Sequence, residues 1–185
     1  MGQLMQKIVL ALILSGLSWA AQAKTWLVDA AQSKLAFSGT YQEDPFDGRF
    51  PFTAQIAFDP ANLKGSKLDV SIDVTRVNSE NEERDAALAE PVWFDFVRFP
   101  RATFVTSAIR ATPRGYIADA LLTIRGSAKK IQFPFTWSEK DGQATLTAKI
   151  TLNRLDFGLG SEEWEDPELI GHEVTVSVLV VSRAR

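Results

Sequence analysis

The feature of the sequence that most constrains its fold is an alternation of apolar and polar residues along most of the chain. Residues 68–74 read Leu-Asp-Val-Ser-Ile-Asp-Val, and residues 145–152 read Thr-Leu-Thr-Ala-Lys-Ile-Thr-Leu. Successive side chains of a β-strand point to opposite faces, so this pattern buries one face and leaves the other in water. The same alternation recurs in four further segments: 35–41, 50–58, 131–137 and 174–180. The pattern predicts an all-β fold of antiparallel strands, each buried on one face.

Turn-forming residues separate these segments and predict how the strands connect. Several dipeptides are typical of tight turns: Asp47-Gly48, Lys64-Gly65, Arg125-Gly126 and Asp141-Gly142. Two further strands are expected over Arg101–Thr112 and Gly115–Arg125. Eight strands in hairpin order predict an up-and-down barrel or a sandwich, and the length of the runs favours the barrel.

The interior of an eight-stranded barrel is either filled by side chains or holds one small ligand. The predicted inner faces are rich in Phe, but they also carry small residues that leave volume: Gly39, Ala54, Ala118, Ala120 and Ala148. A tapering filled core uses small residues as well, so both alternatives stay open. Pro134 lies inside a predicted strand. Because proline donates no backbone N–H, it indicates an edge, a bulge or the seam of the barrel.

Residues 1–23 have the composition of a secretory signal peptide. Lys7 provides a positive charge, residues 8–19 are mostly apolar, and Ala21-Gln22-Ala23 is a small-x-small cleavage site. The apolar run is too short to span a membrane. We therefore expect cleavage after Ala23, a single mature domain of residues 24–185, and a periplasmic location.

Composition excludes several classes of function. The chain has no Cys and one His, and its formal net charge is −3 without a basic block, so nucleic-acid binding is not expected. A metal site needs three or four converging ligands, and His172 has no His or Cys to converge with, so no metal and no metal cofactor are expected. No Ser, His and Asp occur at the spacing of a hydrolase, so the sequence favours a binding protein over an enzyme.

One segment, around residues 80–100, departs from the alternation. Asn81 or Ser79 can cap a short helix that has Glu82 or Glu83 in its first turn, and Pro91 is expected to stop it. Four aromatic residues follow within seven positions: Trp93, Phe94, Phe96 and Phe99. We expect this helix and aromatic lid to cover one end of the barrel and shield an apolar interior from water. The same cluster is also what a filled core would need as its plug.

A series of motifs resembles the YceI-like family of periplasmic, lipocalin-like proteins. The motifs run in order from residue 26 almost to the end of the chain: Trp26-Leu27-Val28-Asp29, Gly48-Arg49-Phe50, Arg84-Asp85, Phe94-Asp95, Phe99-Pro100, Asn153-Arg154 and Phe157-Gly158. The resemblance implies an extended eight-stranded antiparallel barrel with a hydrophobic internal pore. It also implies binding of a long isoprenoid chain, such as a polyprenyl phosphate or the tail of a quinone. The chain departs from the family at Gln32, where His is frequent.

The first functional hypothesis is therefore a non-enzymatic periplasmic carrier that holds one isoprenoid lipid in the barrel. Predicted ligand contacts combine the inner faces with the lid: Leu35, Phe37, Phe50, Phe52, Ile56, Arg84, Asp85, Trp93, Phe94, Phe104, Phe133, Phe135 and Ile150. Arg84 and Asp85 are expected as a buried pair at the mouth. In that pair Arg84 is free to meet a phosphate or a quinone carbonyl, and Asp85 fixes the helix onto the barrel.

The second hypothesis is an interaction protein with a filled core. Its acidic loop around Trp164, residues 162–166, would dock a partner such as a membrane-bound electron carrier or an envelope-stress protein. A homodimer formed at the open mouth is a third alternative. Of the other charged residues, Arg154 is expected to hold a turn by pairing with Asp156 or Asp29, and Arg125 to be solvated at a hairpin tip.

Overall fold

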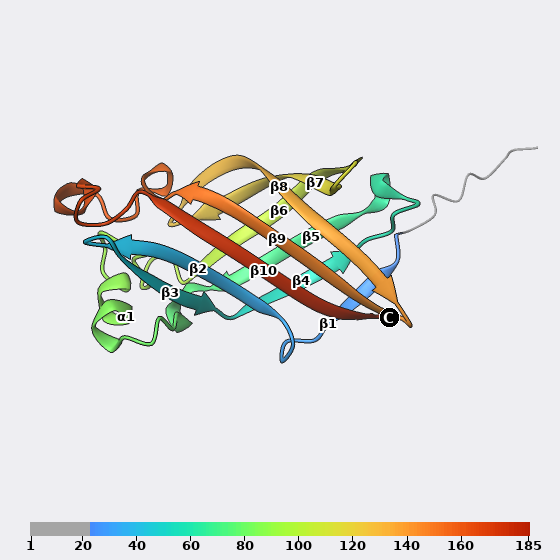
Figure 1. The fold of residues 1–185 in the computed structure, drawn as a ribbon, viewed down its shortest axis with the longest axis horizontal. Helices are drawn as coiled ribbons and strands as arrows, with labels where there is room; N and C mark the ends of the chain where they lie inside the picture. The colour runs from blue at the N-terminus through green and yellow to red at the C-terminus, as the bar shows by residue number, and fades with distance from the viewer. Residues whose placement is uncertain (1–22) are drawn as a thin grey trace, which may run out of the picture.

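The computed structural model describes residues 23–185, which form a closed, elongated antiparallel β-barrel (Figure 1). The sheet has the order β1-β4-β5-β6-β7-β8-β9-β10-β2-β3, and pairing between β1 and β10 closes it. The strands are β1 Thr25–Val28, β2 Lys34–Tyr41, β3 Asp44–Phe50, β4 Phe52–Ala57, β5 Lys67–Asp73, β6 Arg101–Thr112, β7 Gly115–Ile124, β8 Ser127–Lys140, β9 Gln143–Asn153 and β10 Glu173–Ala184. The helices are α1 Glu82–Leu88 and the 3-10 turns η1 Leu63–Gly65, η2 Val74–Arg76, η3 Arg154–Phe157 and η4 Glu162–Glu165.

The ten strands occupy eight positions around the barrel. β10 pairs with β2 through Thr175–Leu179 and with β1 through Ser182–Ala184, so β1 and β2 are two halves of one interrupted strand. β3 and β4 form a second interrupted strand, because only Pro51 separates them and they pair with β2 and β1 respectively. The predicted eight-stranded antiparallel barrel with an inserted helix is confirmed.

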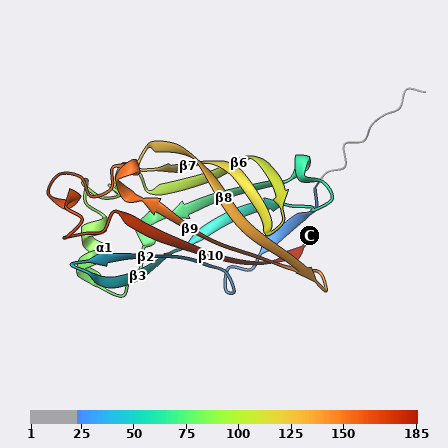
Figure 2. The ribbon, with the colours of Figure 1, turned by 45° about the horizontal axis from the view of Figure 1, so that its top comes forward.

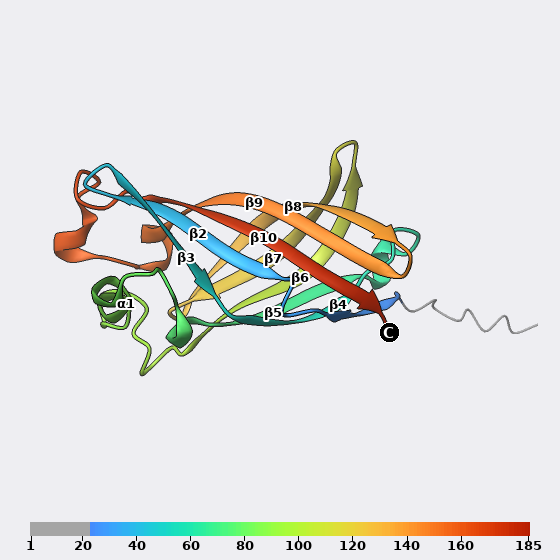
Figure 3. The ribbon, with the colours of Figure 1, turned by 60° about the horizontal axis from the view of Figure 1, so that its bottom comes forward.

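The barrel has two different ends. At one end, the lid end, lie α1, the tip of the β2–β3 hairpin and the segment from η3 through η4 (Figures 1 and 3). At the opposite end, the far end, lie the β6–β7 and β8–β9 turns and the C-terminus. Figure 2 shows β6, β7 and β8 as the wall facing β2 and β3 across the barrel. Strands tilt across the long axis, as closure of a barrel requires.

We call residues 80–100 the lid. Asn81 caps α1, and its side chain accepts a hydrogen bond from the backbone N–H of Arg84 at 2.9 Å. Glu82, Glu83 and Asp85 lie in the first turn, where the helix dipole favours negative charge. The helix ends at Leu88, three residues before Pro91, so the predicted cap and stop are confirmed.

Pro134 marks a seam in the barrel wall. Along β8 the pairing with β7 runs from Ser127 to Phe135, but the pairing with β9 covers only Phe135–Lys140. The edge of β8 from Ser127 to Pro134 therefore has no strand partner on its β9 side. Pro134, which has no backbone N–H to donate, is the last residue of this open edge before the hydrogen-bonded pairing with β9 begins. The predicted seam at Pro134 is therefore confirmed.

One expectation falls almost wholly outside the described residues. The predicted signal peptide lies outside them except for Ala23, which is buried against the barrel. Within residues 23–185, α1 and the 3-10 turns are all too short, or too polar, to cross a lipid bilayer.

Candidate ligand-binding cavity

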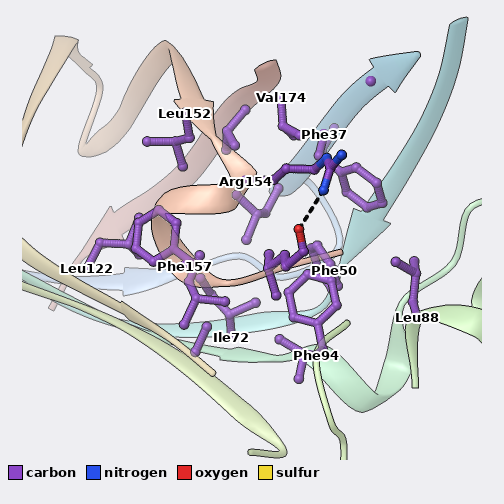
Figure 4. A pocket seen from close by; sticks show the side chains of 18 of the residues that line it. Phe37, Phe50, Ile72, Leu88, Phe94, Leu122, Leu152, Arg154, Phe157 and Val174 are labelled. Carbon is purple, nitrogen blue, oxygen red and sulfur yellow. Dashed lines mark hydrogen bonds between the residues drawn. The ribbon is translucent and has the colours of Figure 1, made fainter. Parts of the chain in front are cut away.

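A cavity of about 570 Å³ occupies the lid half of the barrel. Aliphatic and aromatic side chains from nine strands, β2 to β10, and from the lid surround it, and Figure 4 labels several of them, with Arg154, around a common space. The lining reaches the exposed side chains of Tyr41 and Glu83, so the cavity opens to solvent between the β2–β3 hairpin and α1. We call this opening the mouth. Walls of this kind favour an apolar molecule, because burial of apolar surface supplies the binding free energy.

The far end of the barrel is filled by rings. Trp26, Phe58, Tyr116, Phe135 and Trp137, which we call the plug, make five close ring contacts with centroids 4.7–5.5 Å apart. Phe58 is fully buried, and the indole N–H of Trp26 donates to its carbonyl oxygen at 2.9 Å. None of the five lines the cavity. The interior is therefore filled at the far end and hollow toward the lid.

Of the two alternatives that the small inner residues left open, most of them belong to a tapering filled core and do not create this space. Phe133 lies directly across from Ala118, and Phe135 lies directly across from Ala148. The large ring of one strand fills the volume that alanine leaves on the next, as in a tapering filled core. Of the five small residues named from the sequence, two line the cavity: Gly39 and Ala54.

The structure places most of the predicted ligand contacts around the cavity. Eleven of the thirteen line it: Leu35, Phe37, Phe50, Phe52, Ile56, Arg84, Trp93, Phe94, Phe104, Phe133 and Ile150. Phe135 belongs to the plug, and Asp85 turns away toward Ser79. Sequence reasoning missed lining residues that lie on predicted inner faces, and alternation alone could have found them: Val70, Ile72, Leu122, Leu152, Val174 and Val178.

Phe157, Leu159 and Ile170 also line the cavity but come from irregular segments at the lid end. No periodic signal marks such residues, because 3-10 turns and loops are too short to show a period. They are placed by the fold of residues 154–171, which one buried arginine organises.

Arg154 is that residue. Its side chain is buried, and its five N–H groups all donate to backbone carbonyl oxygens: Gly171 at 3.1 Å, Leu159 at 2.7 Å, Gly160 at 2.6 Å, Ile170 at 3.0 Å, and Trp164. Burial lowers the pKa of the Arg154 guanidinium, and the carboxylate of Glu165 opposes that shift. The expected pairing with Asp156 or Asp29 is wrong, because the guanidinium donates to carbonyls alone. Arg154 lines the cavity (Figure 4) but keeps no donor for a ligand.

Arg84 and Asp85 meet through Ser79 rather than through each other. The Asp85 carboxylate accepts from the Ser79 backbone N–H at 3.0 Å and from its hydroxyl at 2.6 Å. Arg84 donates to the Ser79 hydroxyl at 2.9 Å and to its carbonyl at 2.7 Å. These contacts close the N-terminal side of the lid, so the expected role of Asp85 in holding the helix agrees with its position. The expected buried ion pair is not formed.

Of the two arginines that line the cavity, Arg84 lies at the mouth and keeps N–H groups that can donate to a ligand. Its contacts to Ser79 use Nε and one N–H of Nη2, which leaves three N–H groups. The guanidinium also lies over the ring of Phe46 at 4.7 Å, which fixes it against the β2–β3 hairpin.

Arg125 is half-buried and hydrogen-bonded, whereas the sequence analysis expected it to be solvated. It lies at the tip of the β7–β8 hairpin with a positive φ of 48° and donates to the carbonyl oxygens of Pro91 and Gly158. It thereby joins the lid to the segment that follows η3. Nothing local in the sequence marks this contact, since its partners lie more than thirty residues away.

The acidic loop, residues 162–166, turns its aromatic side chain inward. Trp164 lines the cavity and packs against Trp93 of the lid with ring centroids 6.0 Å apart. Glu162, Glu163 and Glu165 face solvent at the lid end. Trp164 thus closes the cavity, whereas the second hypothesis used it as a docking residue.

The polar groups of the cavity do not form a catalytic set. The described residues that line it include no Ser, Cys, His or Asp, and their ionisable members are Tyr41, Glu83, Arg84 and Arg154. No group of three His, Cys, Asp or Glu side chains with metal-binding geometry occurs within residues 23–185. The arrangement offers apolar volume with one available cation at its mouth.

An eight-stranded antiparallel barrel whose lid end encloses an apolar cavity defines a lipocalin-like class of protein. Residues 26–182 match the YceI-like domain, and the chain belongs to that family. A UPF0312 protein of Pseudomonas putida strain W619 is 31% identical over 166 residues, covering 80% of this chain and 82% of that protein. A UPF0312 protein of Yersinia enterocolitica is 28% identical over 131 residues, covering 70% of this chain and 55% of that protein.

Solved structures show the same fold. BcnA of Burkholderia cenocepacia superposes with a TM-score of 0.79 at 31% identity, covering 84% of this chain and 99% of BcnA. A polyisoprenoid binding domain from Saccharophagus degradans, implicated in plant cell wall breakdown, superposes with a TM-score of 0.67 at 16% identity, covering 88% of this chain and 99% of that domain. At that identity the second likeness shows the fold alone.

Proposed function

We propose that this chain is a non-enzymatic periplasmic carrier that holds the tail of one isoprenoid lipid inside the barrel. The observation that carries the proposal is the 570 Å³ cavity with apolar walls and a mouth at the lid end. The signal-like residues 1–23 support the periplasmic location. The Saccharophagus domain that shares this fold is a polyisoprenoid binding domain, which supports the isoprenoid class.

The mouth supports a small polar head more than a highly charged one. Arg84 offers three N–H groups there, enough for a quinone carbonyl or for one phosphate oxygen. Glu83 lines the same mouth, and the acidic loop adds exposed carboxylates at the same end. A pyrophosphate would meet this negative field, so we place a quinone above a polyprenyl phosphate as the ligand.

The interaction-protein alternative is less well supported. It assumed a filled core, whereas the interior holds a cavity of about 570 Å³, and it assumed that Trp164 was available to a partner, whereas Trp164 packs on Trp93. A homodimer at the mouth and docking to a membrane-bound electron carrier remain predictions from the sequence alone.

Native mass spectrometry of the protein purified from periplasm, followed by organic extraction, tests the proposal. We expect an added mass that extracts as a quinone or a polyprenyl compound. A protein that stays at its apo mass after incubation with isoprenoid quinones and polyprenyl alcohols would contradict the carrier function. Farnesol compared with farnesyl pyrophosphate tests the head group, and we expect the uncharged alcohol to bind more tightly.

A further inference from the structure

The cavity ends at aromatic rings on the wall formed by β6, β7 and β8. Phe104 and Phe133 line the cavity, and their rings meet edge to face with centroids 5.0 Å apart. Phe135, directly behind Phe133, stacks on it at 6.2 Å and does not line the cavity. The Phe104–Phe133 pair is therefore the last layer on this wall that faces empty space.

On the other walls the cavity ends in branched aliphatic residues. Val180 lies across from Leu146, and Ile56 lies across from Leu68, and all four line the cavity. Ile56 pairs with Trp26 and Leu146 pairs with Trp137, and both tryptophans belong to the plug. Together with Phe104 and Phe133, these side chains form a closed floor.

The floor is backed by a continuous network of rings. Phe135 contacts Tyr116 at 5.4 Å and Phe58 at 5.5 Å, and Phe58 is fully buried. Close-packed rings with two side-chain torsions each cannot yield to an entering chain without displacing their neighbours. A ligand that enters at the mouth can advance only as far as this layer.

We propose that this floor sets the length of apolar chain that the protein accepts, and that Phe133 is the residue that ends the path. This inference rests on the proposed function, since it assumes that a chain enters tail first from the lid end. Each buried methylene strengthens binding by about fourfold, so affinity rises with chain length until the chain meets Phe133. Beyond that limit the added carbons stay outside the mouth in water, and the affinity stops rising.

Two substitutions with opposite effects on volume test the floor. Phe133→Ala removes a ring and opens the path toward Phe135. Val178→Phe adds a ring to a wall that faces the empty cavity. Dissociation constants are measured by displacement of an apolar fluorescent dye, with linear alcohols of increasing length and with a polyprenyl series that starts at farnesol and geranylgeraniol. Gln132→Ala, an exposed neighbour of Phe133 on the outer face, is the matched control.

The chain length at which the affinity stops rising, the limit, should be the same in the wild type and in the control. Phe133→Ala should move that limit to longer chains and bind the first alcohol beyond the wild-type limit at least about tenfold more tightly. Val178→Phe should move the limit to shorter chains. A general loosening of the barrel cannot produce shifts of opposite direction. If Phe133→Ala fails to fold, Phe133→Leu and Val178→Phe carry the test.

The outcomes separate the floor from the proposed function. An unchanged limit in both variants overturns the role of the floor and leaves the carrier function standing. A limit that shifts for linear alcohols, while no polyprenyl alcohol binds, supports the floor and contradicts the isoprenoid ligand. If neither the linear alcohols nor the polyprenyl alcohols bind, both the floor and the carrier function are overturned.

Discussion

The guanidinium of Arg125 donates a hydrogen bond to the carbonyl oxygen of Pro91, 34 residues earlier in the chain. A second hydrogen bond from Arg125 reaches the carbonyl of Gly158. One side chain at a hairpin tip therefore joins the lid to the segment after η3. These two segments lie on neighbouring sides of the cavity, so the contact helps to hold the lid end closed.

Replacing Arg125 should loosen the lid without disturbing the barrel. Arg125→Ala removes two hydrogen bonds to backbone carbonyls, and we expect a loss of about 1–2 kcal/mol in the free energy of unfolding. Faster amide exchange should appear in residues 89–100 and 158–165, and not in β6 or β9. The control is Arg114→Ala, an exposed arginine in the hairpin turn at the far end. Equal amide exchange in the wild type and Arg125→Ala would contradict the role of this contact.

Replacing Arg154 should be far more damaging. Arg154→Leu leaves five carbonyl oxygens without their donor, three of them in residues 164–171, and we expect a loss of roughly 3 kcal/mol or more. Urea denaturation measures the change. Arg110→Leu is the control, because Arg110 pairs with Asp119 on the exposed surface and its loss should cost less than about 1 kcal/mol. Similar losses in the two variants would show that the buried carbonyls find other donors.

The Ser79 contacts should hold the start of the lid. Asp85→Ala removes the acceptor of both the N–H and the hydroxyl of Ser79, so we expect a loss of about 1–2 kcal/mol in the free energy of unfolding. Glu83→Ala changes a carboxylate of the same helix that makes no such bond to Ser79. It should therefore alter thermal unfolding less. A larger effect of Glu83→Ala would indicate that charge in the first turn, and not the contact with Ser79, stabilises α1.

The inner and outer faces of the barrel should differ in their effect on ligand uptake. Phe50 lines the cavity and stacks on Phe37 with centroids 5.0 Å apart, so Phe50→Asp places a charge where apolar surface is needed. We expect binding of an apolar fluorescent dye to weaken at least about tenfold. Lys149→Asp, on the exposed outer face, should leave binding unchanged. Equal losses in both variants would overturn the assignment of faces, and circular dichroism checks that both remain folded.

The turn between β1 and β2 should contribute a pH-dependent stability. A side-chain hydrogen bond from Gln32 is the main cause that lowers the pKa of Asp29 below 3.8, with backbone N–H groups of Gln32 and Ala31 adding to it. Because the folded-state pKa lies below the unfolded value, the stabilisation is present above pH 3.8 and is lost as the pH falls through the folded-state pKa. Gln32→Ala should therefore lower stability at pH 7 and converge with the wild type in acid, measured by denaturation across that range. A difference that is the same at every pH would contradict this origin.

Local pattern predicted much of the molecule because its causes are local. Period-2 alternation depends on the direction of successive side chains, so it assigned the inner and outer faces of β5, β9 and β10 from the sequence. The cap at Asn81 depends on a residue and the N–H three positions later, and it too could be read from the chain. Eight of the eleven predicted contacts that line the cavity lie on strands and follow from the same alternation.

The residue types on the inner faces also determined that the interior is apolar. The tertiary structure alone decided where that interior is hollow. Ala118 and Ala148 leave no space because the register places Phe133 and Phe135 directly across from them. Arg125 binds carbonyls more than thirty residues away, and Arg154 binds carbonyls of a loop that wraps around it, so both sets of partners are set by the fold. The position of the cavity and the partners of each hydrogen bond depend on which residues become neighbours in space. In an antiparallel barrel the strand register sets those neighbours.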